Sequence, residues 1–152
     1  MRQVKTLSTL GVLIFIAVSP AQAAAPNNSI VKLIVSATSD NMPMASNSKM
    51  TTAMSGSASA IFALNKVAST LCYLISSKGL KNITEAHIQV TSTEKDVLVI
   101  NPKSINLPRS TCLNLPRTSL VDIAAHPEKY SFMIHTKTNP DGAVMGDLMT
   151  SR

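Results

Sequence analysis

Two histidines stand in segments whose polar and apolar residues alternate. His87 and Gln89 are two residues apart in the segment 84–91, and His135 belongs to the segment 130–137. Alternate side chains of a β-strand point to the same face, so His87 and Gln89 are predicted to share a polar face, opposite the apolar residues around them. The same alternation assigns His135 and the later Asp147 to polar faces. The predicted polar-face or ligand site consists of His87, Gln89, His135 and Asp147.

This set of residues favours a hydrogen-bonding role over metal binding. Imidazole nitrogens suit copper and zinc, but a metal centre needs at least three well-placed ligands. Gln89 carries an amide, which is a poor ligand for either metal. We therefore expect no metal and no cofactor, with the two histidines hydrogen bonding around their strands and Asp147 orienting His135. A metal site at these residues is the alternative.

Methionines are frequent in the long polar segment 38–55, which contains Met42, Met44, Met50 and Met54. Thioethers are soft ligands that select Cu(I). The corresponding alternative metal site consists of Met42, Met44, His87 and His135. The other interpretation is that adaptable methionine side chains cover an open edge of the sheet. We favour packing for the methionines.

No catalytic residues are predicted. The sequence lacks a Gly-x-Ser-x-Gly nucleophile motif, a Gly-rich phosphate loop and a His-Glu-x-x-His zinc motif. The chain has 8 acidic residues, and nothing in their spacing favours an acid–base pair over solvated positions. We expect a protein that is not an enzyme.

The elements that must position the candidate residues are short strands with Pro, Gly and Asn at the turns between them. Predicted strands cover 30–36, 57–64, 70–76, 84–91, 96–100, 109–115 and 130–136, and a last strand closes at Gly146-Asp147-Leu148. A tight turn is predicted at Asn139-Pro140-Asp141-Gly142. One helix is predicted from Ser119, which can cap it, to the residues before Pro127. This spacing is typical of an antiparallel β-sandwich or open barrel.

Two cysteines, Cys72 and Cys112, lie on alternating segments of this pattern. An even cysteine count in an exported protein predicts a disulfide, which would close a loop of about 40 residues and add about 4 kcal/mol of stability in the chain-entropy model. Two free buried thiols are an alternative, and a redox-active pair is another, although catalytic pairs usually stand close together as Cys-x-x-Cys.

The strand with His87 and the C-terminal segment resemble the chordin-type (CHRD) domain family. That family has an Ala-His-Ile-His strand, matched by Ala86-His87-Ile88-Gln89, and a hairpin with Val-His-Thr, Asn-Pro-Gly and Gly-Gln-Leu motifs. Residues 134–136, 139–142 and 146–148 match that hairpin, and the resemblance extends over 30–148. It implies an all-β, immunoglobulin-like or Cu,Zn superoxide dismutase-like antiparallel β-sandwich with one short helix. It also implies one cysteine before the histidine strand and one before the helix.

Two positions depart from the family pattern. Gln89 stands where the family often has a second histidine, and Asn41-Met42-Pro43-Met44 replaces a Gln-Glu-Val-Pro-Pro stretch. The resemblance of the family's His-x-His strand to the copper-holding strand of superoxide dismutase implies an alternative function, that of a copper-binding or superoxide dismutase-like metalloprotein.

The first residues have the features of a secretory signal peptide. Arg2 and Lys5 precede an apolar run over 10–18, and Ala21-Gln22-Ala23 is a small-x-small cleavage site. We predict a signal peptide over 1–23, a disordered lead over 24–29 and a CHRD-like domain over 30–150. The protein is then exported, periplasmic or secreted, with no transmembrane segment after cleavage; a retained anchor is the alternative.

Composition argues against nucleic-acid binding. The formal net charge of +6 falls by two when Arg2 and Lys5 are removed, and the chain has no Trp, two Tyr and three Phe for stacking on bases.

The family was first described in a secreted antagonist of growth factors. We therefore predict a monomeric, non-catalytic binding or structural module of the cell envelope or extracellular space, whose partner is an unknown protein or envelope component.

Overall fold

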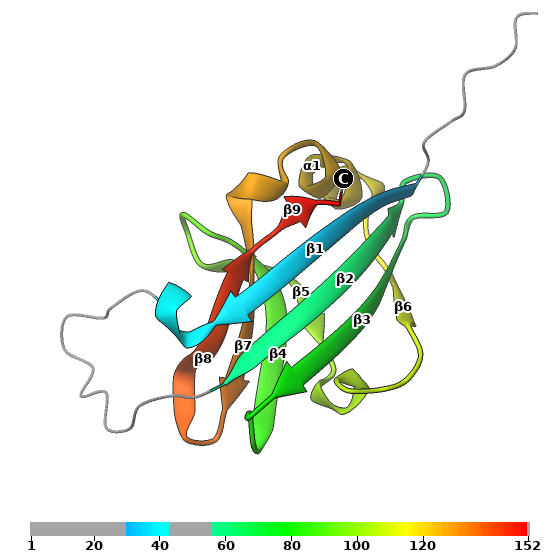
Figure 1. The fold of residues 1–152 in the computed structure, drawn as a ribbon. Coiled ribbons are helices and arrows are strands. Elements are labelled where there is room, and N and C mark those ends of the chain that lie inside the picture. The colour runs from blue at the N-terminus through cyan, green and yellow to red at the C-terminus, as the bar shows by residue number, and fades with distance from the viewer. Residues whose placement is uncertain (1–29, 43–55, 152) are drawn as a thin grey trace, which may run out of the picture.

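The computed structural model describes residues 30–42 and 56–151. Within these residues the chain forms β-strands, one α-helix and three short 3₁₀ helices (Figure 1). The predicted signal peptide over 1–23, the lead over 24–29, and Met44, Met50 and Met54 lie outside the described residues. None of the helices within 30–42 and 56–151 has the length and hydropathy that crossing a bilayer requires.

The strands follow the predicted alternating segments closely. They are β1 (Ile30–Thr38), β2 (Ser57–Asn65), β3 (Thr70–Lys78), β4 (Ile83–Val90), β5 (Lys95–Ile100), β6 (Thr111–Asn114), β7 (Tyr130–Thr136), β8 (Asn139–Asp147) and β9 (Met149–Thr150). The helix is α1 (Arg117–Ala125), and the 3₁₀ helices are η1 (Ser39–Asn41), η2 (Pro102–Ser104) and η3 (Pro127–Lys129).

One antiparallel sheet contains all of these strands, in the order β5-β4-β7-β8-β1-β2-β3-β6, with β9 paired to β1. The sheet curls, so that β1, β2 and β3 lie in front of β4, β5 and β7, with α1 at one end (Figure 1). The ring centroids of Phe62 on β2 and Phe132 on β7 are 5.8 Å apart, so side chains of the two halves meet in the core. The predicted all-β, sandwich-like fold with a single short helix is confirmed for the described residues.

Alternation along each strand separates the core from the surface. On β2 every second residue is buried. On β7 Tyr130, Phe132 and Ile134 are buried in the core, opposite the polar face predicted for His135. Val144 and Leu148 are also buried, while Asp147 between them is exposed. The apolar faces of both halves therefore point inward, which leaves the other face of each strand available for function.

The predicted turn at Asn139-Pro140-Asp141-Gly142 is wrong. β8 already begins at Asn139, and the hairpin turns at residues 137–138. The backbone N–H of Asn139 donates to Thr136 Oγ1 at 3.2 Å, which supports this shorter turn. Gly142 has a φ of +127°, which only glycine adopts readily, and it lies within β8 near the register shift between Ile134 and Thr136.

The predicted helix cap at Ser119 is also wrong. α1 begins at Arg117, and the residue before it is Pro116, which makes no side-chain capping hydrogen bond. Proline has no backbone N–H, so at this position it leaves no donor without a partner. The cap therefore lies at Pro116, three residues before the predicted cap at Ser119. Asp122, three residues after Ser119, accepts a hydrogen bond from the hydroxyl of Tyr130.

Cys72 and Cys112 occupy directly opposite positions of β3 and β6. Their sulfur atoms are 2.03 Å apart, so the structure pairs the two cysteines as predicted. The disulfide attaches the short strand β6 to the edge of the sheet.

Candidate functional site

The candidate histidines lie side by side on the outer face of β4 and β7. Pairing of these strands places Glu85 opposite His135, His87 opposite Met133, and Gln89 opposite Ser131. Directly paired residues share one face of an antiparallel sheet, and the residues between them face the core. We call the surface formed by Glu85, His87, Gln89, Ser131, Met133 and His135 the histidine face.

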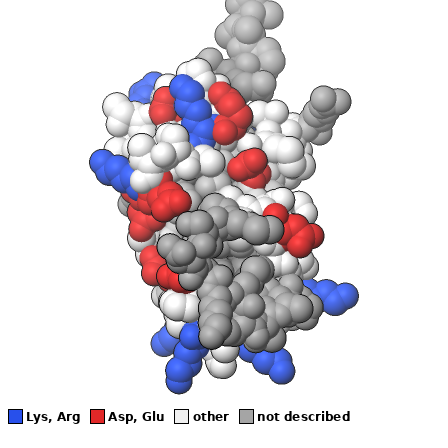
Figure 2. All heavy atoms as spheres, turned by 90° about the vertical axis from the view of Figure 1, so that its left-hand side faces the viewer, with Lys and Arg blue, Asp and Glu red and all other residues white. Residues whose placement is uncertain are grey.

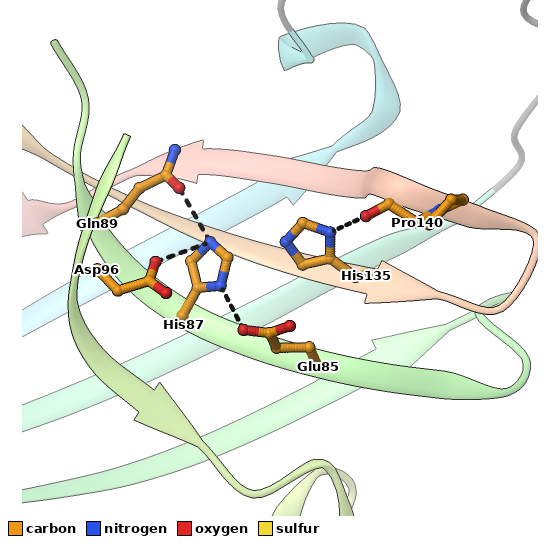
Figure 3. A network of polar contacts seen from close by, with 6 residues as sticks. All are labelled: Glu85, His87, Gln89, Asp96, His135 and Pro140. Carbon is orange, nitrogen blue, oxygen red and sulfur yellow. Dashed lines mark hydrogen bonds and ion pairs between the residues drawn. The ribbon is translucent and has the colours of Figure 1, made fainter. Parts of the chain in front are cut away.

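His87 is buried among polar groups, although it faces away from the core. Its Nε2 lies 2.9 Å from Oε1 of Gln89 and 3.6 Å from a carboxylate oxygen of Asp96, while its Nδ1 lies 3.4 Å from a carboxylate oxygen of Glu85 (Figure 3). Because the amide oxygen of Gln89 accepts, Nε2 donates and carries the proton in the neutral ring. Nδ1 then has a lone pair directed at a carboxylate and makes no hydrogen bond.

His135 makes its hydrogen bond through Nδ1, whereas His87 makes its hydrogen bond through Nε2. Its Nδ1 lies 2.7 Å from the carbonyl oxygen of Pro140, which can only accept, so Nδ1 donates. Its Nε2 is buried and has no hydrogen-bond partner. The ring centroids of His135 and His87 are 4.8 Å apart, and Figure 3 shows the free nitrogen of His135 on the side of its ring that faces His87.

The four predicted site residues are only partly brought together. His87, Gln89 and His135 meet on the histidine face, as alternation indicated. Asp147 lies on β8 opposite Ser131, and the group that holds His135 is the carbonyl of Pro140. The burial of His87 and Gln89, each 5 % exposed, was not predicted, because alternation assigns a face and does not show what covers it.

The site also contains two carboxylates that were not predicted, those of Glu85 and Asp96. Glu85 shares the face of His87, and the same alternation could have identified it. Asp96 reaches His87 from β5 because the β4–β5 register shifts between Ile88 and Gln89. No sequence pattern reports a shift of this kind. Glu85, His87 and Asp96 offer ligand atoms that all lie within 4.8 Å of one another.

One of the predicted methionines reaches the border of the histidine face. A Cβ atom placed at Gly142 would lie 3.1 Å from the sulfurs of both Met42 and Met133, so these sulfurs are separated by at most about twice that distance. Met133 is the direct strand partner of His87. The missing side chain at Gly142 therefore leaves the space in which Met42 packs beside the site. Met44 lies outside the described residues.

The site and the fold together define an all-β, sandwich-like domain with a histidine strand beside a C-terminal hairpin. A family model described as the CHRD domain matches residues 35–148, about three quarters of the chain. The chain belongs to the CHRD domain family, which confirms the resemblance found in the sequence. Neither a curated protein nor a solved structure matches the chain.

Proposed function

We propose that this CHRD-family chain works outside the cytoplasm as a non-catalytic domain that binds a protein partner through the outer face of β1, β2 and β3. An extracytoplasmic location is supported by the signal-like N-terminus and by the disulfide pair, which persists in oxidising compartments. The binding role is supported by one surface feature of the sheet.

That feature is a line of exposed apolar side chains across four strands, which we call the apolar row. Met149, Ile34, Ile61 and Leu74 are successive strand partners, so they stand next to one another on the outer face. They are 52 %, 39 %, 50 % and 37 % exposed, respectively. The inward-facing residues of the same strands already fill the core, and exposed apolar groups that cluster in this way are typical of interaction surfaces.

The shape of the surface favours a protein over a small molecule. Small ligands bind in concave pockets that bury most of their surface, whereas the apolar row lies on a sheet face that no described helix or strand covers (Figure 1). Beside it runs a second line of strand partners, Ser36, Ser59 and Ser76, which are all exposed. Their short side chains let another flat surface approach the apolar row, with hydroxyl groups at its border.

Photo-crosslinking from this face tests the proposal. A photoreactive amino acid at Ser59, two residues from Ile61, is expected to yield a discrete adduct with another protein when the chain is expressed in its host cells. The same label at exposed Thr118 on α1 is the control, and it should yield no such adduct. The substitution Ile61→Glu should abolish the adduct from Ser59, because a carboxylate enters an apolar contact without a partner.

The proposal is overturned if Ser59 gives no adduct, if Thr118 gives the same one, or if the adduct survives Ile61→Glu. An adduct with the mass of two copies of the chain would also overturn it, since the apolar row would then mediate self-association. Circular dichroism of Ile61→Glu checks that the variant folds, as expected for a change at a half-exposed position.

A further inference from the structure

We infer that the histidine face is a binding site for a divalent transition-metal ion of the zinc or copper type, held by His87, His135 and the neighbouring carboxylates. The site lies on β4, β5 and β7, away from the apolar row on β1, β2 and β3, so it stands independently of the proposed partner. The sequence alone favours the absence of a metal, because Gln89 stands where the family often has a second histidine in that strand. Glu85, His87 and Asp96 offer ligand atoms within 4.8 Å of one another, and the proposed second imidazole is His135 on β7, whose ring centroid lies 4.8 Å from that of His87.

The hydrogen bonds of the two rings select the tautomers that a metal requires. A histidine that binds a metal through one nitrogen usually donates the N–H of its other nitrogen to a carbonyl or carboxylate. His135 donates from Nδ1 to the carbonyl of Pro140, and His87 donates from Nε2 to the amide oxygen of Gln89. In its neutral form each ring therefore presents a bare nitrogen, Nε2 of His135 and Nδ1 of His87.

Both bare nitrogens are buried without a hydrogen-bond partner. His87 is nine-tenths buried, since only 7 % of its side chain is exposed. A buried polar atom that stays unpaired destabilises the fold, so two in neighbouring rings call for a ligand. Among residues 30–42 and 56–151, Ser131 Oγ is the third such atom, and it lies on the same histidine face.

The group opposite Nδ1 of His87 specifies a cation. Two acceptors, this nitrogen and a carboxylate oxygen of Glu85, face each other at 3.4 Å with no proton between them in the neutral ring. A tetrahedral zinc ion with ligand distances of 2.0–2.2 Å holds its ligand atoms roughly 3.3–3.5 Å apart, so this pair already has a suitable spacing. The side chain of Glu85 is 46 % exposed, so it has room to close around an ion at Nδ1 while His87 stays in place. Asp96, which is 44 % exposed, lies beside the protonated Nε2 and adds negative charge next to the site.

The ligand chemistry selects the class of metal. Imidazole with carboxylate suits zinc and Cu(II), whereas calcium and magnesium bind oxygen ligands almost entirely. The nearest charged groups also favour a cation, because carboxylate oxygens of Glu85 and Asp96 lie 3.4 Å and 3.6 Å from the ring nitrogens of His87. The side of the molecule that β8 and η1 occupy in Figure 1 carries a concentration of Asp and Glu, with Lys and Arg toward its two ends (Figure 2). This side is acidic although the whole chain has a formal charge of +6.

Titration of the purified, disulfide-containing protein with zinc chloride and with a Cu(II) salt tests the inference. Isothermal calorimetry is expected to show one ion per chain, with Cu(II) bound more tightly than zinc. Electron paramagnetic resonance of the Cu(II) form should show coupling to two imidazole nitrogens. The substitution His135→Ala should weaken binding by more than the roughly 10–100-fold that loss of an outer partner causes, while Gln89→Ala should fall within that range.

His126 supplies the matched control. It is the third histidine of the chain, stands at the end of α1, and has a carboxylate oxygen of Glu128 3.5 Å from its Nδ1. The substitution His126→Ala should leave the metal affinity unchanged. Thermal unfolding without metal establishes that His135→Ala is folded, and His87→Gln serves as a second variant of similar size.

Three results would overturn the inference. The first is the absence of stoichiometric zinc or Cu(II) binding, and the second is an equal loss in His126→Ala, which would mean loose binding to surface histidines. The third is binding of Cu(I) alone that is lost in Met42→Leu and retained in His87→Gln, which would move the site to the Met42–Met133 pair. None of these results bears on crosslinking from Ser59, so the proposed partner is tested separately.

Discussion

Tyr130 joins the sheet to the helix through a single hydroxyl group. Its ring lies in the core at the start of β7, and its hydroxyl donates a hydrogen bond to Asp122 on α1. Burial, the hydrogen bond to Asp122 and the negative charge of that carboxylate, in decreasing order of effect, together raise the pKa of Tyr130 from 10.0 to about 12. The folded protein therefore holds the phenol proton more tightly than the unfolded chain does.

The first prediction concerns the alkaline stability that follows from this pKa. Because the folded pKa is raised, the contribution of Tyr130 is fully present below pH 10 and is lost as the pH rises from 10 toward about 12. The substitution Tyr130→Phe should lower the free energy of unfolding at pH 7 by about 1–3 kcal/mol, since it removes a hydrogen bond to a charged group. Between pH 10 and 12, the unfolding free energy of Tyr130→Phe should fall less than that of the wild type, because the variant has no phenol to titrate. Urea denaturation at several pH values measures both effects.

Asp122→Asn is the companion variant for this prediction, because it keeps an acceptor and removes the negative charge. It should bring the pKa of Tyr130 closer to 10, which ultraviolet difference titration of the phenol can follow. Equal alkaline sensitivity in the wild type and in Tyr130→Phe would contradict the role assigned to this residue.

At the scale of elements, the two halves of the sheet join where β8 meets β1. Thr38 and Met145 are the paired residues at this junction, and Gly146 follows immediately. A Cβ atom at Gly146 would collide with the carbonyl oxygen of Ser36 and would lie 2.8 Å from its carbonyl carbon. The close approach of the two strands therefore depends on the absence of a side chain at this position.

The second prediction compares Gly146→Ala with Gly56→Ala. The added methyl at position 146 meets backbone atoms of β1, which cannot move without disturbing the sheet, so a loss of about 1–3 kcal/mol in unfolding free energy is expected. At position 56 the added methyl meets the end of the Leu80 side chain, which can rotate away. Urea denaturation should therefore show a clearly larger loss for Gly146→Ala. Equal losses would mean that the β8–β1 contact does not depend on this glycine.

The elements themselves were largely predictable from local pattern, because alternation reports burial along a single strand. β7 was predicted with its observed bounds, and His87 and Gln89 on β4 were assigned to the face that points away from the core, as was Asp147 on β8. The turn near Asn139 was misplaced because Pro, Asp and Gly also suit a strand bulge, and composition does not distinguish the two. The contact of Asp96 with His87 depends on a register shift between strands, which no single segment encodes.

At the scale of the whole molecule, pairing order decides which residues meet. β4 pairs with β7, and β8 pairs with β1, although long stretches of chain separate the members of each pair. These pairings bring His87 beside His135 and Ile34 beside Ile61, and thus create both proposed surfaces. Sequence pattern predicted the class of fold but not this order, since non-local pairing follows from packing of the entire sheet. The cysteine pair was the exception, because two cysteines allow only one intramolecular disulfide.

The last prediction concerns that disulfide, which fixes the end strand of the sheet. β6 is four residues long and pairs only with β3 in the described sheet, and Cys72 and Cys112 are opposite each other in this pair. The bond closes a loop with a sequence separation of 40, for which the chain-entropy model gives about 4 kcal/mol of stability. The double substitution Cys72→Ala with Cys112→Ala should lower the unfolding free energy by about this amount, and urea denaturation beside the oxidised wild type measures it.

Hydrogen exchange locates this effect within the sheet. Amides of β6 should lose protection first in the double variant, while amides of β7 in the core should follow the global stability.

Mass spectrometry of protein isolated from the exported fraction should show a chain that begins at Ala24 and carries two hydrogens fewer than its reduced form. Free thiols in freshly isolated protein, or unchanged stability in the double variant, would contradict a structural role for the bond. If the bond forms only on export, the edge of the sheet is completed in the same compartment where the apolar row and the histidine face are proposed to act.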